Sequence, residues 1–291
     1  MSISECVTMD KDFNSGKRME KSMIKRVSVG HFKRIAAVFF IAFSANVYAL
    51  NNGSEEQTTD PVQQVRIGDK YFNGIGVLRN RAEGIKWYRK AAEQGNPEAQ
   101  IRLGRCYLKG VGVPYDSAEG IKWYRKAAEQ GNSYAQVKLG GFYMKGRYVK
   151  EDKKEGIRLF TEAANRNDPY AQFKLGECYY RGIGVEKDFK NAVRLFSMSA
   201  VQGYARGQYY LGLCYLKGEG IKLDTKKAAK LFAMAAKQGV VEAQAELGKC
   251  YFYGTGVKKN EEEGLKWIRC AAAEGNWDSI SFLRNLESEN K

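Results

Sequence analysis

The chain has 291 residues, of which 44% are hydrophobic, and it carries a formal charge of +15. Its single histidine, His31, lies near the N-terminus, so the remainder of the chain cannot form a histidine-based triad, a Cys-His dyad or a His-ligated zinc site. Residues 1–49 contain eight Lys/Arg and four Asp/Glu, so most of the excess positive charge belongs to the residues that follow.

The first 49 residues have the pattern of a secretory signal. Basic side chains precede an apolar run at Ile35–Phe43, and Val47–Ala49 then has the spacing of a signal cleavage site. We expect residues 1–49 to be removed on export, which gives a periplasmic or secreted protein with no integral membrane segment. A membrane anchor is the alternative, although the apolar run is shorter than the ~20 residues that a spanning helix needs.

Two further points concern this N-terminal region. The stretch before Lys21 is long for the charged part of a signal, so translation from Met19 or Met23 is an alternative start. Residues 50–62 are mostly polar and contain no aromatic side chain. We expect them to form a flexible linker.

From residue 63 onward the chain repeats itself every 36 residues. The segment AEGIKWYRKAAEQGN occurs at Ala82–Asn96 and again, unchanged, at Ala118–Asn132. A tyrosine also recurs on this spacing, at Tyr71, Tyr107, Tyr143, Tyr179, Tyr215 and Tyr251. Such a period is typical of repeat architectures, in which each unit buries its apolar face against its neighbours. We therefore divide the chain into six units, 63–98, 99–134, 135–170, 171–206, 207–242 and 243–278, followed by a C-terminal capping helix and tail at 279–291.

Both halves of each unit have the periodicity of an amphipathic helix. In one first half, for example, Ala171, Leu175, Cys178 and Tyr179 stand at i, i+4, i+7 and i+8. A Gly-x-Gly-Val sequence separates the two halves in most units, and a further glycine follows the second half. Glycine suits the left-handed conformation that ends a helix. Each unit is therefore predicted to be a helix hairpin, and the fold to be all-α.

Small residues recur at two further positions in the units. One is the glycine that follows Leu or Ile in the first helix, and the other is a column in the second helix that begins with Gly84. A glycine inside a helix costs ~1 kcal/mol in helix propensity. We interpret both columns as places where the two helices approach too closely for a larger side chain.

The order of residues resembles the Sel-1-like repeat family, relatives of the tetratricopeptide repeats. The pattern A-Q-x-x-L-G-x-x-Y-x-x-G-x-G-V at Ala99–Val113, followed by Trp123–Asn132, carries the resemblance. It implies a right-handed α-solenoid of stacked hairpins and a non-catalytic adaptor or scaffold, often a secreted bacterial protein that engages host or envelope partners. The third unit departs from the pattern, with Tyr148 and Asn167 in place of glycines, which leaves its local loop and curvature open.

The cysteines do not have the spacing of a metal site. Cys106, Cys178, Cys214 and Cys250 occupy one column of the repeat, whereas metal ligands commonly stand two to four residues apart. We predict small buried side chains in this column, with no metal and no cofactor. Cys270 lies on the second helix of the last unit, and a disulfide with Cys250 is an open alternative. Without the signal the cysteine count is five, so at least one thiol stays free or pairs with another chain.

An enzymatic alternative comes from the same resemblance, because a cysteine-rich branch of the family is linked to penicillin-binding and β-lactamase-like activity. That branch has cysteines at positions where this chain has Ala92 and Gln100. The Ser-x-x-Lys motif of β-lactamases occurs only at Ser22–Lys25 and Ser288–Lys291, without an accompanying Lys-Thr-Gly. We therefore expect the protein not to be an enzyme.

By analogy with tetratricopeptide stacks, the first helices of the units line a concave groove. In this chain the groove positions are apolar and rich in tyrosine, with a basic margin, and we expect them to bind a protein or peptide partner. The candidate residues are Tyr134, Tyr170, Phe173, Tyr180, Tyr209, Arg105, Lys109, Lys145, Arg181 and Lys217. Packing between repeats is the alternative explanation of the aromatic side chains.

The basic margin predicts an acidic partner. Phosphate contacts of Lys and Arg would also suit nucleic acid. However, Lys and Arg alternate with Glu on the second helices, and export removes the protein from the cytosol. An anionic peptide, glycan or lipid surface fits the charge better than nucleic acid does.

Overall fold

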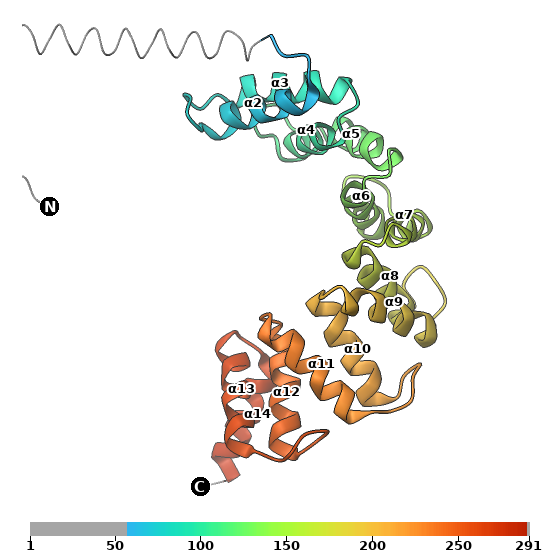
Figure 1. Cartoon of the computed structure of the whole chain (residues 1–291), viewed down its shortest axis with the longest axis vertical. Helices are drawn as coiled ribbons and strands as arrows, with labels where there is room; N and C mark the ends of the chain where they lie inside the picture. The colour runs from blue at the N-terminus through green and yellow to red at the C-terminus, as the bar shows by residue number, and fades with distance from the viewer. Residues whose placement is uncertain (1–56, 290–291) are drawn as a thin grey trace, which may run out of the picture. The chain divides into compact units, whose positions relative to one another are not determined.

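The computed structural model describes residues 57–289, so the predicted signal at 1–49 lies outside the described residues. The described part contains thirteen α-helices and no strand (Figure 1), which confirms the predicted all-α repeat architecture. All of the helices belong to one compact unit, Asp60–Lys291. They are α2 (Pro61–Asn73), α3 (Arg81–Glu93), α4 (Pro97–Lys109), α5 (Ser117–Glu129), α6 (Ser133–Lys145), α7 (Lys153–Asn165), α8 (Pro169–Arg181), α9 (Phe189–Val201), α10 (Ala205–Lys217), α11 (Thr225–Lys237), α12 (Val241–Tyr253), α13 (Glu261–Ala273) and α14 (Trp277–Glu289).

The helices form a row of antiparallel hairpins that stack in chain order. Within a unit the first and second helices pack together, as α2 does with α3 and α8 does with α9. The second helix of each unit then packs against the first helix of the next, as α7 does against α8. Helix α14 continues the row after the last full hairpin and packs on α13 (Figure 1). Among residues 57–289, no helix combines the length and the apolar character that crossing a membrane requires.

The first helix begins slightly earlier than expected from the sequence. The linker was predicted to extend to residue 62, whereas α2 starts at Pro61. The Asp60 side chain accepts a hydrogen bond from the Val62 backbone N–H at 3.0 Å, which caps the helix. Proline is favoured at the first helical position because its missing N–H has no partner there in any case. These two residues therefore set the start of α2.

Left-handed residues end the helices, as the glycine pattern predicts. Gly182 follows α8 with a φ of 69°, and its N–H donates to the Cys178 carbonyl. In the third unit the two replaced glycines keep this conformation, with a φ of 68° at Tyr148 and 64° at Asn167. They are the only non-glycine residues with positive φ in the part of the chain that the structure describes. The departure from the pattern therefore changes the residue type and leaves the turn unchanged.

The small residues lie at helix crossings, which confirms their predicted role. A Cβ atom added to Gly84 would come within 2.7 Å of the Gly68 carbonyl oxygen and 2.8 Å of the Phe72 nitrogen. A Cβ atom added to Gly176 would lie 2.8 Å from the ring of Phe196. Contacts this short are repulsive, so α3 and α9 can approach their partner helices only where a side chain is absent.

The column of cysteines is part of the core, as predicted. The side chains of Cys106, Cys178, Cys214 and Cys250 are buried between the helices of their units. All five cysteines of residues 57–289 are free thiols, so the alternative of a disulfide between Cys250 and Cys270 is not realised in this structure. Cys250 is buried and Cys270 is exposed.

A row of buried glutamines connects each hairpin to the one before it, a feature that the sequence analysis did not anticipate. Gln172 on α8 donates through Nε2 to the Ala164 carbonyl of α7 at 3.4 Å, and its Oε1 accepts from Gln202 Nε2 at 2.8 Å. Gln100 and Gln208 make the same two kinds of hydrogen bond. Gln100 and Gln172 are the Gln of the repeated Ala-Gln pair, and Gln208 takes the same position after Gly207. Their position therefore has a structural role in joining neighbouring units.

Candidate functional site

The exposed side of α4, α6, α8 and α10 is the candidate binding surface, and we call it the first-helix surface. Two of the predicted tyrosines are well exposed there. Tyr134, at the start of α6, has 48% of its surface exposed, and Tyr170, at the equivalent position of α8, has 39%. Large aromatic side chains that face solvent in this way are available to a partner.

Phe173 is a correction to the sequence analysis, because only 1% of its surface is exposed. Its ring lies 5.4 Å from that of Tyr204 and 6.1 Å from that of Phe196, inside a core cluster. The equivalent residue of the previous unit, Val137, is buried as well. This column therefore points between the helices rather than toward a partner, and the expectation that Phe173 forms part of the binding surface is wrong.

Tyr180 and Tyr209 are half-buried and are held by contacts within the protein. The Tyr180 hydroxyl donates a hydrogen bond to a Glu219 carboxylate oxygen at 2.5 Å. Burial and this hydrogen bond raise the pKa of the Tyr180 hydroxyl. The ring of Tyr209 packs 6.0 Å from that of Phe232, at the edge of another core cluster. Packing between helices therefore explains most of the contacts of these two tyrosines.

The predicted basic residues all lie at the surface. Arg181 is engaged, with its guanidinium 3.1 Å from a Glu177 oxygen and donating to the Tyr210 hydroxyl at 2.7 Å. The other four form no ion pair with any carboxylate of residues 57–289: Arg105, Lys109, Lys145 and Lys217. Their charges are therefore available to an acidic partner.

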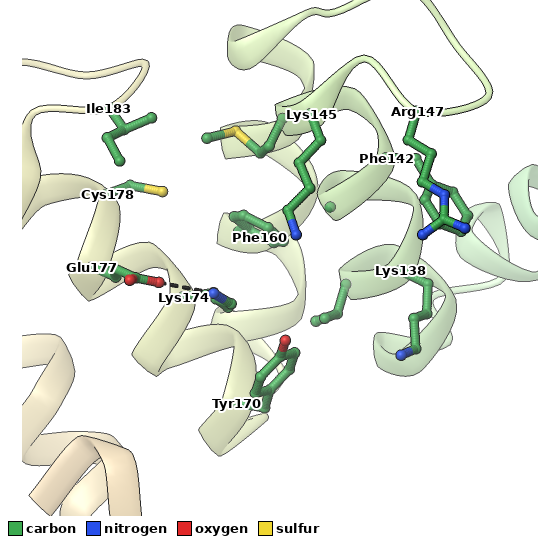
Figure 2. Close-up of a pocket in the computed structure, with 13 residues that line it drawn as sticks. Lys138, Phe142, Lys145, Arg147, Phe160, Tyr170, Lys174, Glu177, Cys178 and Ile183 are labelled. Carbon is green, nitrogen blue, oxygen red and sulfur yellow. Dashed lines mark hydrogen bonds and ion pairs between the residues drawn. The ribbon is translucent and has the colours of Figure 1, made fainter. Parts of the chain in front are cut away.

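A pocket of about 420 Å³ lies between α6 and α8 on this surface (Figure 2). Tyr170 and Lys145 line it, and Figure 2 shows the Tyr170 hydroxyl and the Lys145 ammonium both pointing into the space between the two helices. The structure thus brings together two of the residues that the sequence predicted. The volume falls within the range of roughly 300–1,000 Å³ that is usual for ligand sites.

Further residues of this pocket were not anticipated from the sequence. Three of them are cationic, namely Lys138, Arg147 and Lys174, and another is Gly141. Lys138 lies over the Tyr134 ring at 5.1 Å, and Lys174 pairs with Glu177 at 2.8 Å. The available signal was the glycine pair Gly140-Gly141, which no other unit has at this place.

The groups that line the pocket are mainly apolar and cationic. Cys178 is the one thiol in the pocket, and burial raises its pKa to about 11, so it stays protonated and weakly nucleophilic at neutral pH. Within residues 57–289 there is no group of three or more His, Cys, Asp or Glu side chains placed to hold a metal ion. The pocket can instead offer apolar contact area and positive charge.

The sequence matches the Sel1 repeat family six times, at residues 64–96, 97–132, 133–168, 169–204, 205–240 and 241–276. None of the curated proteins compared with the chain matches it. Among solved structures, a protective antigen present in uropathogenic Escherichia coli strains, which displays an SLR fold, is 35% identical with a TM-score of 0.73. That similarity covers 78% of this chain and 48% of the E. coli protein, so this chain spans about half of that protein's length.

A second solved structure matches over most of both chains. The Sel1 repeat protein from Oxalobacter formigenes is 37% identical, with a TM-score of 0.65, and the similarity covers 73% of this chain and 85% of that protein. Sel1 repeats generally bind other proteins, and proteins built from them are generally non-catalytic scaffolds. With six consecutive matches that together span residues 64–276, this chain belongs to the Sel1 repeat family.

Proposed function

We propose that this protein is an exported, non-catalytic scaffold that holds a segment of an acidic protein on its first-helix surface. One observation carries the proposal: the exposed tyrosines Tyr134 and Tyr170 lie beside cations that have no carboxylate partner among the described residues. Exposed aromatic side chains next to available positive charge are typical of the residues that dominate protein interfaces.

The distribution of charge favours an acidic protein over nucleic acid. On the second helices some lysines pair with neighbouring carboxylates, as Lys86 does with Glu83 at 2.8 Å and Lys122 does with Glu119 at 3.0 Å. A nucleic-acid surface needs a continuous series of cations along the phosphates. On the first-helix surface, unpaired cations such as Lys138 and Lys145 lie among apolar and aromatic side chains, which suits a peptide segment that carries both apolar and acidic groups.

Export is supported by the signal-like sequence of residues 1–49. N-terminal sequencing of the protein recovered from periplasm and medium tests this part of the proposal. We expect the mature chain to begin at Leu50, and recovery of an intact N-terminus from the membrane fraction would contradict it.

The binding role is tested by site-specific cross-linking. A photoreactive amino acid is placed at Tyr170, and the partner that it captures from envelope or host extracts is identified and purified. We expect the double variant Tyr134→Ala/Tyr170→Ala to bind this partner more weakly by roughly 2 kcal/mol, the scale of interface hot spots. Calorimetry or surface plasmon resonance gives the affinity, and circular dichroism verifies that the helices are unchanged.

The matched control is Tyr115→Ala. Tyr115 is also exposed, but it lies in the loop between α4 and α5 rather than on the helices of the first-helix surface. This variant is expected to bind as tightly as the parent protein. Equal affinity of the parent and the double variant would place the partner elsewhere and contradict the proposal.

A further inference from the structure

Gly141 is unlike every other helical glycine in residues 57–289. A Cβ atom added to any of the others would come within 3.0 Å of a neighbouring atom, as at Gly140, where the Phe160 ring would be 2.9 Å away. A Cβ atom added to Gly141 would meet nothing within 4 Å. A glycine inside a helix costs about 1 kcal/mol relative to alanine. At Gly141 no helix crossing accounts for that cost.

The other units have side chains at the position of Gly141. The equivalent residues are Asp69, Arg105, Glu177, Leu213 and Lys249. Gly141 lines the pocket between α6 and α8, so a side chain there would project into the space that the pocket occupies. The missing side chain therefore keeps this pocket open, and we call it the Gly141 pocket.

The Gly141 pocket combines an apolar lining with an excess of positive charge. Its apolar lining consists of Val137, Phe142, Met144, Phe160 and Ile183. Lys138, Lys145 and Arg147 stand on the α6 side (Figure 2), and none of them forms an ion pair with a carboxylate of residues 57–289. The charge of Lys174, on the α8 side, is offset by Glu177 at 2.8 Å. The pocket thus offers three cations without a carboxylate partner.

We propose that the Gly141 pocket binds a large apolar side chain of an acidic peptide segment, while carboxylates of the same segment pair with Lys145 and its neighbouring cations. This inference rests on the proposed function and names the part of the partner that is recognised. The apolar lining requires an apolar group, because a simple anion would leave the partly exposed side chains of Met144 and Ile183 without an apolar contact. The cations next to it require negative charge on the same segment.

The test uses fluorescein-labelled peptides and fluorescence anisotropy with the full protein. The peptide EELFEE has both features, EEGGEE keeps only the negative charge, and KKLFKK keeps the apolar residues with the opposite charge. We expect EELFEE to bind about tenfold more tightly than either of the other two, a difference of ~1.4 kcal/mol.

Two variants alter the pocket itself. Gly141→Leu fills the open space and is expected to weaken EELFEE binding about tenfold, and Lys145→Glu is expected to do the same by reversing a charge. The control for charge is Lys230→Glu, because Lys230 is exposed on the second helix α11 and does not line the pocket. It is expected to change the affinity by less than about twofold, since exposed charges at a distance are screened.

Several results would overturn the proposal. These are equal binding of EELFEE and EEGGEE, parental affinity of Gly141→Leu, or equal losses in Lys145→Glu and Lys230→Glu. Complete displacement of EELFEE by an equal concentration of a single-stranded oligonucleotide would assign the pocket to phosphates. A dimer in sedimentation experiments that Gly141→Leu abolishes would identify a second copy of the chain as the occupant.

Two further measurements separate a failure of the pocket inference from a folding defect and from a failure of the proposed function. Leucine favours helix more than glycine does, so Gly141→Leu is expected to keep the parental circular dichroism and to melt no earlier than the parent. If the cross-linked partner is lost in Tyr134→Ala but still binds Gly141→Leu with parental affinity, the pocket inference fails while the scaffold function stands. If neither variant affects the partner, the proposed surface fails as well.

Discussion

Gly176 lies where α8 crosses α9, with the ring of Phe196 against it. We expect Gly176→Val to lower the free energy of unfolding by about 1–3 kcal/mol, because the added methyl groups overfill a close contact. Urea denaturation monitored by circular dichroism measures the change.

The matched control is the same substitution at Gly141, where nothing lies within 4 Å of an added Cβ atom. There no repulsive contact opposes the gain in helix propensity, so Gly141→Val is expected to leave the free energy of unfolding unchanged or to raise it. If both variants lose the same stability, the crossing at Gly176 has no special role.

The buried and the exposed cysteines are expected to react with alkylating reagents at different rates. The thiolate is the species that alkylating reagents attack, and burial raises the pKa of the Cys178 thiol to about 11, from an ordinary value of 9.0. Cys270 is exposed. We expect iodoacetamide at pH 8 to modify Cys270 in the native protein and to spare Cys178 until denaturant is added.

Peptide mass spectrometry at successive times follows the modification of each cysteine. Cys214 is the internal check, because burial raises its pKa as well, to about 12, and it should be protected in the same way. Modification of Cys178 as fast as that of Cys270 would show that the α8 region opens readily.

At the scale of single residues, the sequence predicted only in part where the candidate side chains point. Tyr134 and Tyr170 were placed correctly at an exposed surface, whereas Phe173 was not. The error has a physical cause, because the analogy with another repeat family fixes positions along a helix only approximately. A rotation of a fraction of a turn moves a side chain from the surface into the core. Burial in a stack of helices depends on that rotation, which one sequence does not specify.

At the scale of helices, the hydrogen bonds of Gln172 connect α8 to α7 and to the end of α9, and their contribution to the free energy of unfolding can be measured. Gln172 is fully buried and bridges these helices through hydrogen bonds to Ala164 and Gln202. We expect Gln172→Leu to lower the free energy of unfolding by about 1–3 kcal/mol, because buried polar groups lose their partners. Urea denaturation provides the measurement.

Gln244 supplies the comparison for this prediction. It occupies the equivalent place on α12, but its Oε1 has no hydrogen-bond partner, since Glu274 stands where four other units have a glutamine donor. Gln244→Leu is therefore expected to cost clearly less than Gln172→Leu. Equal costs would mean that side-chain volume, rather than the hydrogen bonds, makes the difference at Gln172.

The helices themselves could be predicted almost completely, because glycine positions and apolar periodicity determine local structure. The Gly141 pocket could not. Its existence depends on a missing side chain and on the spacing between α6 and α8, which are 36 residues apart in the repeat. The double glycine was visible in the sequence, but only the structure shows that Gly140 fills a helix crossing while Gly141 faces open space.

At the scale of the whole molecule, the excess positive charge predicts how association depends on salt. The charges at Lys109, Lys145 and Lys217 are exposed and unpaired among the described residues, so they should attract an acidic partner over a distance. The screening length falls from about 30 Å at 0.01 M salt to about 8 Å at 0.15 M. We expect the association rate constant to fall over this range while the dissociation rate constant changes little.

Surface plasmon resonance with the cross-linked partner measures both rate constants. The triple variant with glutamine at these three lysines should associate more slowly and lose most of the salt dependence. A dissociation rate constant that carries the whole salt effect would instead indicate that these charges act only in the formed complex.

The exact duplication of Ala82–Asn96 at Ala118–Asn132 also has a consequence for folding. While the chain folds, α3 and α5 compete for the same place against α2, because the side chains that fill this place are identical. A misregistered stack of this kind loops out one hairpin and forfeits the area that the hairpin would bury. It also removes Arg102 on α4 from its ion pair with Asp69, at 2.6 Å in the native fold. Residues that differ between the units thus decide which of two equivalent helices takes its correct place, a choice that proteins without repeats do not have to make.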